Sequence, residues 1–129
     1  PYDHSGPKAG LPNIDPTNVF NSPDGLAFDS RGRLWIQTDG NYSNDGDFVE
    51  MGNNQMLVAD TNTGEIKRFL VGPKECEVTG ITWSIDRKTM FVGIQHPGER
   101  GHSHFPGGKQ SVPRSSIIAV TRDDGKMIG

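Results

Sequence analysis

One segment of the chain reads GLAFD at residues 25–29 and continues as LWIQ at residues 34–37. A similar pattern, GITWS at residues 80–84 with MFV at residues 90–92, returns 55 or 56 residues later. Each pattern holds two short runs of apolar, β-branched and aromatic residues joined by a polar turn, which is typical of paired strands. The sequence therefore repeats one β-sheet unit.

The same strand pattern extends along the whole chain. Predicted strands cover residues 26–29, 33–37, 55–60, 65–71, 79–84, 89–95 and 115–121, and a further strand is predicted to begin at Lys126. No stretch of ten or more residues combines a helical period with capping residues. The fold class that these patterns predict is all-β.

The length of the repeat indicates how the strands are grouped. About 55 residues hold four strands and a long loop, which is the size of one blade of a β-propeller. We therefore predict two four-stranded antiparallel blades, at about residues 26–71 and 79–129. Two blades cannot close a ring, so residues 1–129 are predicted to form a single fragment of a larger propeller, with the remainder of that propeller as a partner.

Composition and charge exclude several classes of partner. The net charge is −3, and 13 basic residues are scattered among 16 acidic ones, which argues against binding to nucleic acid. No run of 18 apolar residues is present, so no membrane span is predicted. Residues 1–10 also lack the apolar stretch of a signal peptide, and the single Cys76 allows no internal disulfide.

Two acidic residues stand at corresponding places before the repeated glycine. Asp24 and Glu77 lie at the predicted start of the innermost strand of each blade, where a propeller brings its strands toward a central channel. Converging carboxylates repel one another unless a cation or a proton neutralises them. This pattern predicts a divalent metal site, although the sequence around Asp24 is also that of an ordinary turn.

Two loops offer further metal ligands. Residues 39–50 place oxygen-bearing side chains at positions 1, 3, 5, 7, 9 and 12, beginning with Asp39, as in a calcium loop of the EF-hand type. Position 6 is Asn44 instead of glycine, so a solvated loop between strands is the alternative. Residues 96–104 carry three histidines and Glu99, a set that could bind zinc or another transition metal, but their glycine and proline content favours a mobile surface loop. His96 differs from the other two because it ends a predicted strand at the rim of the sheet.

Several longer strings of the sequence resemble one known family, the PhoX-type bacterial alkaline phosphatases. They are SPDGLAFDSRGRLWIQTDG at residues 22–40, GNNQML at 52–57, RFLVGP at 68–73, CEVTG at 76–80, QHPGE at 95–99 and PRSS at 113–116. The similarity runs in order from about Phe20 to the last residue. The end of the chain resembles the carboxyl end of the family, which implies a carboxyl-terminal fragment.

The resemblance implies a function and a set of cofactors. Members of this family resemble six-bladed propellers that hold calcium and iron in their central channel, hydrolyse phosphomonoesters, and are periplasmic or secreted. The implied metal ligands are Glu77, Asp24 and Asp39, while the iron-binding cysteine of the family lies in an earlier segment and is not Cys76. An isolated fragment is expected to be inactive, since a metal cluster needs all of its ligands.

Two other functions are compatible with the same pattern. The chain could belong to a calcium-binding propeller without enzymatic activity, because a fold does not dictate its chemistry. A lactonase-type propeller is a further alternative, since such sites also gather acidic residues around one divalent ion.

Overall fold

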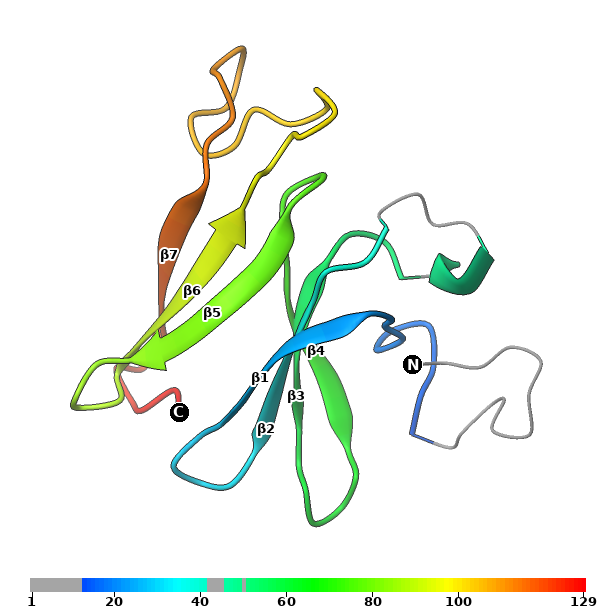
Figure 1. The fold of residues 1–129 in the computed structure, drawn as a ribbon. Helices are drawn as coiled ribbons and strands as arrows, with labels where there is room; N and C mark the ends of the chain where they lie inside the picture. Colours follow the sequence, from blue (N-terminus) through cyan, green and yellow to red (C-terminus); the bar gives the residue numbers. More distant parts are fainter. Residues whose placement is uncertain (1–12, 42–45, 50) are drawn as a thin grey trace.

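The computed structural model describes residues 13–41, 46–49 and 51–129, which form two antiparallel β-sheets (Figure 1). The strands of the first sheet are β1 (Pro23–Phe28), β2 (Leu34–Thr38), β3 (Gln55–Ala59) and β4 (Ile66–Val71), in that order. The second sheet contains β5 (Glu77–Trp83), β6 (Thr89–Gln95) and β7 (Ser116–Thr121). A short 3-10 helix, η1 (Gly46–Phe48), is the one helical element in the described residues, and no helix there could cross a membrane. The predicted all-β class is confirmed.

The last predicted strand is wrong. The residues from Lys126 onward do not pair with a strand, so the second sheet has three strands instead of four. Ile128 is instead buried, and its N–H donates to the carbonyl of Arg87 at 2.8 Å. The carboxyl-terminal residues (red in Figure 1) therefore lie against the two sheets, and the apolar side chain of Ile128 packs into the core.

The repeated glycine marks the same irregularity in both sheets. The pairing of β1 with β2 shifts register around Gly25, and that of β5 with β6 shifts at Gly80. Gly80 has a φ of +55°, which side chains rarely adopt, and a Cβ at Gly25 would lie 2.5 Å from Oε1 of Gln37. The Gln37 amide also donates to the carbonyl of Gly80 at 3.2 Å. One buried side chain on β2 thus holds the bulged first strands of both sheets together.

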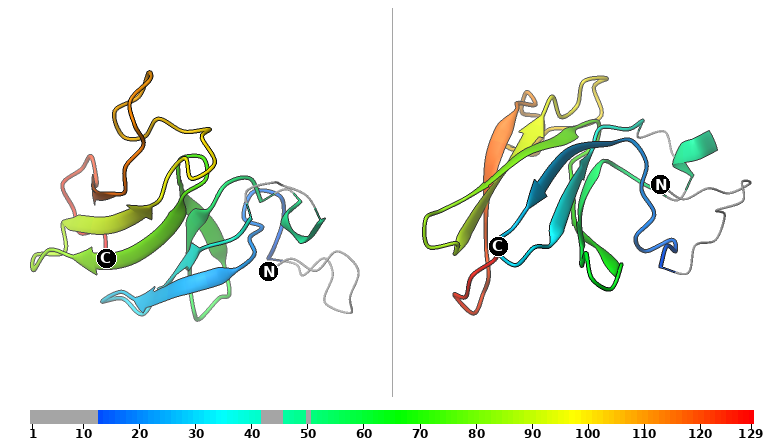
Figure 2. Two further views of the ribbon diagram at one scale, coloured as in Figure 1. Left: turned by 45° about the horizontal axis from the view of Figure 1, so that its top comes forward. Right: turned by 60° about the horizontal axis from the view of Figure 1, so that its bottom comes forward.

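A shared core holds the two sheets side by side, with β5 in contact with β1, β2 and β3 (Figure 2). Trp35 and Met56 from the first sheet pack against residues from the second sheet and its flanks, namely Cys76, Val78, Met90, Val92, Ile94 and Ile128. These side chains are at most 6% exposed. Burial of this apolar surface is the main force that joins the sheets.

The outer faces of the two sheets differ. The first sheet carries a second buried cluster, in which Phe20 from the preceding segment packs against Ile36, Leu57 and Ile66. On the second sheet, Ile117 remains 77% exposed and lines an apolar hollow of about 320 Å³. In the described residues, the second sheet therefore still presents an apolar surface.

Asp29 organises the turn between β1 and β2. Its side chain is fully buried and accepts hydrogen bonds from Trp35 Nε1 at 2.9 Å and Arg33 Nε at 2.7 Å. Burial alone would raise the pKa of this carboxyl, but bonds from Trp35, Arg31 and Arg33 outweigh it and hold the pKa below its usual range. The carboxylate thereby connects the turn to the core tryptophan.

The Asp29→Ala variant is expected to lose about 2 kcal/mol of stability, because the buried Trp35 N–H and the Arg33 guanidinium lose their acceptor. Urea unfolding of the protein measures this loss. Asp86→Ala is the matched control, since Asp86 accepts bonds in the turn before β6 but is exposed. An equal loss in the two variants would contradict the role of Asp29.

Candidate metal centre

Three strand ends meet where the two sheets adjoin. Asp39 directly follows β2, Glu77 is the first residue of β5, and His96 directly follows β6. Since β5 and β6 are antiparallel, the start of one lies beside the end of the other, and Glu77 pairs with Gln95. One ligand atom from each of Asp39, Glu77 and His96 lies within 4.8 Å of the other two. Among the described residues this is the one such group of three potential ligands.

Two of the three residues, Asp39 and His96, line a small hollow of about 260 Å³. Glu77 is 7% exposed, Asp39 is exposed and His96 is half-buried. Nε2 of His96 lies 3.7 Å from Oε2 of Glu77. The group therefore combines one buried carboxylate with two ligands that solvent can reach.

The carboxyl of Glu77 is in an unfavourable electrostatic environment. Burial raises its pKa first, and the negative charges of Asp39 and Asp24 raise it further. A hydrogen bond with Thr79 and the nearby His96 oppose this shift only in part. A cation bound between these carboxylates would remove the repulsion, so the site favours positive charge.

The donor set fits a metal ion and limits its type. Two carboxylates and one imidazole are ligands that iron, zinc and manganese accept in proteins. Calcium prefers oxygen ligands alone, so Asp39 and Glu77 suit it better than His96 does. Three protein ligands also leave coordination positions open for water or substrate, as catalytic metal sites require.

The predicted ligands are brought together in part. Asp39 and Glu77 both belong to the group of three, and they come from different sheets. Asp24 on β1 lies outside this group, but it is close enough for its charge to raise the pKa of Glu77. His96 was a candidate from the histidine loop, but it was not in the ligand set of Glu77, Asp24 and Asp39 that the resemblance implies. Its place at the end of a strand had set it apart, and the antiparallel pairing of that strand with the strand of Glu77 is what brings the two side chains together.

The other two histidines of residues 96–104 have different partners. Nδ1 of His102 contacts the Glu75 carboxylate, while Nδ1 of His104 lies 3.0 Å from the carbonyl of Ser111. The three imidazoles therefore do not converge, which contradicts a zinc site built from this loop. The alternative prediction of a calcium loop at residues 39–50 depends on residues 42–45, on Glu50 and on the Asp47 side chain, which lie outside the described residues.

Cys76 precedes Glu77 but faces the core. Its side chain packs among the buried residues between the sheets. Burial, together with the charge of Glu77, raises the pKa of the Cys76 thiol to about 12. The thiolate that a metal would require is thus strongly disfavoured here, in agreement with the exclusion of Cys76 as a ligand.

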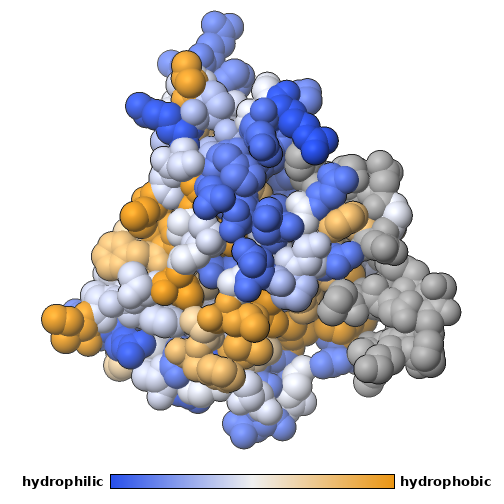
Figure 3. Space-filling view, viewed as in Figure 1, coloured by the Kyte–Doolittle hydropathy of each residue, from blue (hydrophilic) through white to orange (hydrophobic). Residues whose placement is uncertain are grey.

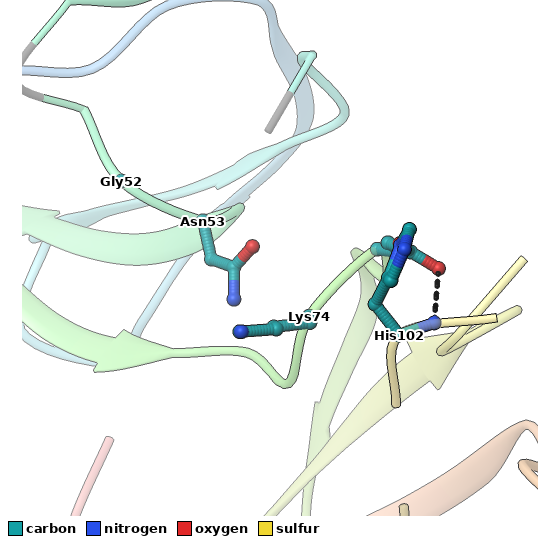
Figure 4. A pocket seen from close by; sticks show the side chains of 5 residues that line it. Gly52, Asn53, Lys74 and His102 are labelled. Atoms are coloured by element: carbon teal, nitrogen blue, oxygen red, sulfur yellow. Dashed lines mark hydrogen bonds and ion pairs between the residues drawn. The ribbon is translucent and has the colours of Figure 1, made fainter. Parts of the chain in front are cut away.

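A second hollow of about 410 Å³ lies beside the first and is lined by Gly52, Asn53, Lys74, Glu75 and His102 (Figure 4). Glu75 lines both hollows. The backbone N–H of His102, which is labelled in Figure 4, donates to Oε2 of Glu75 at 3.3 Å. Glu75, a buried acidic residue, therefore lies where the two hollows adjoin.

Comparison with known proteins agrees with the sequence resemblance. The family described as "Alkaline phosphatase PhoX" matches residues 3–98. Among solved structures, the chain is similar to "Pseudomonas fluorescens PhoX in complex with vanadate, a transition state analogue", with 62% sequence identity and a TM-score of 0.90. This similarity covers 98% of the chain and 22% of the chain of that structure. No curated protein sequence matches the chain.

The fold and the site define the class of the protein. It is an all-β protein in which two sheets bring two carboxylates and an imidazole to one candidate metal centre. The family match covers most of the chain, and the structural similarity covers nearly all of it. The chain belongs to the PhoX alkaline phosphatase family, and the resemblance identified from the sequence is confirmed.

The raised pKa of Glu77 predicts that metal-free protein is more stable when this charge is removed. The ordinary pKa of this carboxyl is 4.5, and its pKa in the folded state is higher, so binding of a proton stabilises the fold. This stabilisation is complete below the ordinary pKa and is lost as the pH rises through the raised pKa. With a chelator at neutral pH, Glu77→Gln should gain about 1 kcal/mol in urea unfolding. The gain should vanish below about pH 4.5.

Glu65→Gln is the control for this measurement, because Glu65 is exposed and pairs with Lys67 far from the site. A Glu77→Gln variant that is less stable than the original protein at neutral pH, or whose gain does not depend on pH, would contradict the electrostatic account of the site.

Proposed function

We propose that this chain is part of a metal-dependent alkaline phosphatase that hydrolyses phosphomonoesters, and that it contributes metal ligands to the active site. The observation that carries the proposal is the meeting of Asp39, Glu77 and His96 within 4.8 Å of one another, in a chain similar to a phosphatase solved with a transition-state analogue. Vanadate in that structure is consistent with chemistry at a phosphoryl group.

Calcium and iron are the proposed cofactors. The imidazole of His96 supports iron near the group of three, while the oxygens of Asp24 and Asp39 suit calcium. When bound, such ions neutralise negative charge on the phosphoryl oxygens and hold the phosphomonoester substrate in place. Glu77, which has the least access to solvent, would fix the ion, and Asp24 would balance its charge from β1.

The rest of a larger propeller is the proposed structural partner. Several large apolar side chains remain exposed, with Leu26 at 62%, Phe28 at 66% and Ile117 at 77%. Figure 3 shows apolar side chains gathered over the middle of one face of the molecule. Exposed apolar surface of this kind is typical of an interface. We propose that further blades cover it, with residues 26–71 and 79–129 as two blades of the ring, and that the whole protein is periplasmic or secreted.

Hydrolysis of a chromogenic phosphomonoester by the longer protein that carries this chain tests the proposal. The Glu77→Ala variant is expected to reduce kcat/KM at least about 100-fold, because a metal supplies several kcal/mol of transition-state stabilisation. Circular dichroism should show an unchanged β-sheet spectrum. The isolated chain is expected to be inactive, since it holds only part of the ligands.

The alternatives make different predictions in the same assay. A calcium-binding propeller without enzymatic activity would show no turnover in the original protein at any Ca²⁺ concentration. A lactonase-type propeller would instead open a lactone ring with the same dependence on Glu77. Either result would overturn the phosphatase proposal.

A further inference from the structure

The segment that carries His96 is fastened to one buried carboxylate, that of Glu75. The Glu75 side chain is fully buried, and Oε2 accepts the backbone N–H of Arg100 at 2.7 Å and that of His102 at 3.3 Å. Oε1 contacts Nδ1 of the His102 ring. The N–H of Gly98 also donates to the carbonyl of Lys74 at 3.0 Å. The chain after β6 therefore wraps around Glu75.

Glu75 also contacts His96 directly through its main chain. The Glu75 carbonyl lies 3.2 Å from Nδ1 of His96. A carbonyl can only accept a hydrogen bond, so this contact requires a proton on Nδ1, and in the neutral ring the lone pair then lies on Nε2, the nitrogen 3.7 Å from Glu77. Histidines that bind metals usually donate their other ring N–H in this way.

The backbone at Glu75 is held in an uncommon conformation. Its φ is +64°, in the left-handed region that residues other than glycine seldom adopt, and the φ of His96 is +38°. Such conformations persist where the surrounding contacts hold them, and they cluster at functional sites. At Glu75 this conformation accompanies a carboxylate directed at the segment after β6 and a carbonyl directed at His96.

We propose that Glu75 is a positioning residue that prepares His96 to bind the metal. Its carboxylate fixes the path of residues 96–102, and its carbonyl fixes the tautomer and orientation of the imidazole. Glu75 lies outside the group of three candidate ligands, and its carboxylate instead accepts the backbone N–H groups of Arg100 and His102 through Oε2 and contacts the His102 ring through Oε1. This inference rests on the proposed function in one respect, namely that Asp39, Glu77 and His96 form the metal site.

Mn²⁺ titration of the longer, metal-depleted protein, followed by electron paramagnetic resonance, tests this role without measuring activity. The site to be followed is the one whose affinity falls in His96→Ala. Glu75→Gln should weaken this site by about 10-fold to 100-fold, as expected for a partner of a ligand. Glu75→Gly should do the same, and it guards against misfolding because glycine accepts the positive φ without strain.

The double variants separate positioning from general stability. In a His96→Ala background, Glu75→Gly should cause no further loss of Mn²⁺ affinity, because its effect passes through His96. Hydrogen exchange should become faster at residues 96–104 and stay unchanged in β2 and β5. Glu65→Gln, at an exposed surface position, should change neither quantity.

Two outcomes would contradict the proposal, and they can be told apart. Affinity within about twofold of the original in Glu75→Gln and Glu75→Gly, or a further loss in the double variant, would overturn the positioning role alone. Unchanged Mn²⁺ binding in both His96→Ala and Glu77→Ala would overturn the metal site, and the positioning role with it.

Discussion

The packing of β5 against the first sheet is the interaction on which the rest of the structure depends. The candidate ligands come from both sheets, since Asp39 follows β2, Glu77 begins β5 and His96 follows β6. Their distances are therefore fixed by the core that joins the sheets, in which Trp35 and Met56 pack against residues such as Val78. Gln37 strengthens this junction from within, because it contacts the bulges of both first strands.

The same junction concentrates negative charge in a partly buried place. Burial favours the neutral form of the Glu77 side chain, and repulsion from the negative charges of Asp39 and Asp24 disfavours its charged form further. A protein retains such an arrangement where function requires it, and the loss of stability is offset elsewhere. The apolar core between the sheets and the hydrogen bonds of Asp29 are among the contacts that stabilise the fold around this site.

The sequence predicted most of the fold but less of the site. The strand periodicity along the chain predicted the class and seven of the strands, and the repeat around Gly25 and Gly80 grouped them. The strand predicted from Lys126 failed because a buried apolar side chain, Ile128, occurs equally in a strand and in a terminal anchor. Glu77 was predicted as a metal ligand from its place at the start of a strand and Asp39 from its loop and the resemblance, and the structure brings the two together, while metal binding itself stays a prediction. The sequence singled out His96 but not its proximity to Glu77, and it did not indicate Glu75 at all, because both depend on β6 returning beside β5 and on backbone conformations that the sequence alone does not reveal.

Anomalous X-ray scattering from crystals of the metal-loaded longer protein tests the central claim most directly. Data collected on both sides of the iron absorption edge show where iron lies, and the remaining density shows which side chains coordinate it. The account predicts an ion at about 2.0–2.6 Å from Glu77 and from at least one of Asp39 and His96. Fully loaded crystals in which every ion lies beyond coordination distance of all three side chains would contradict it.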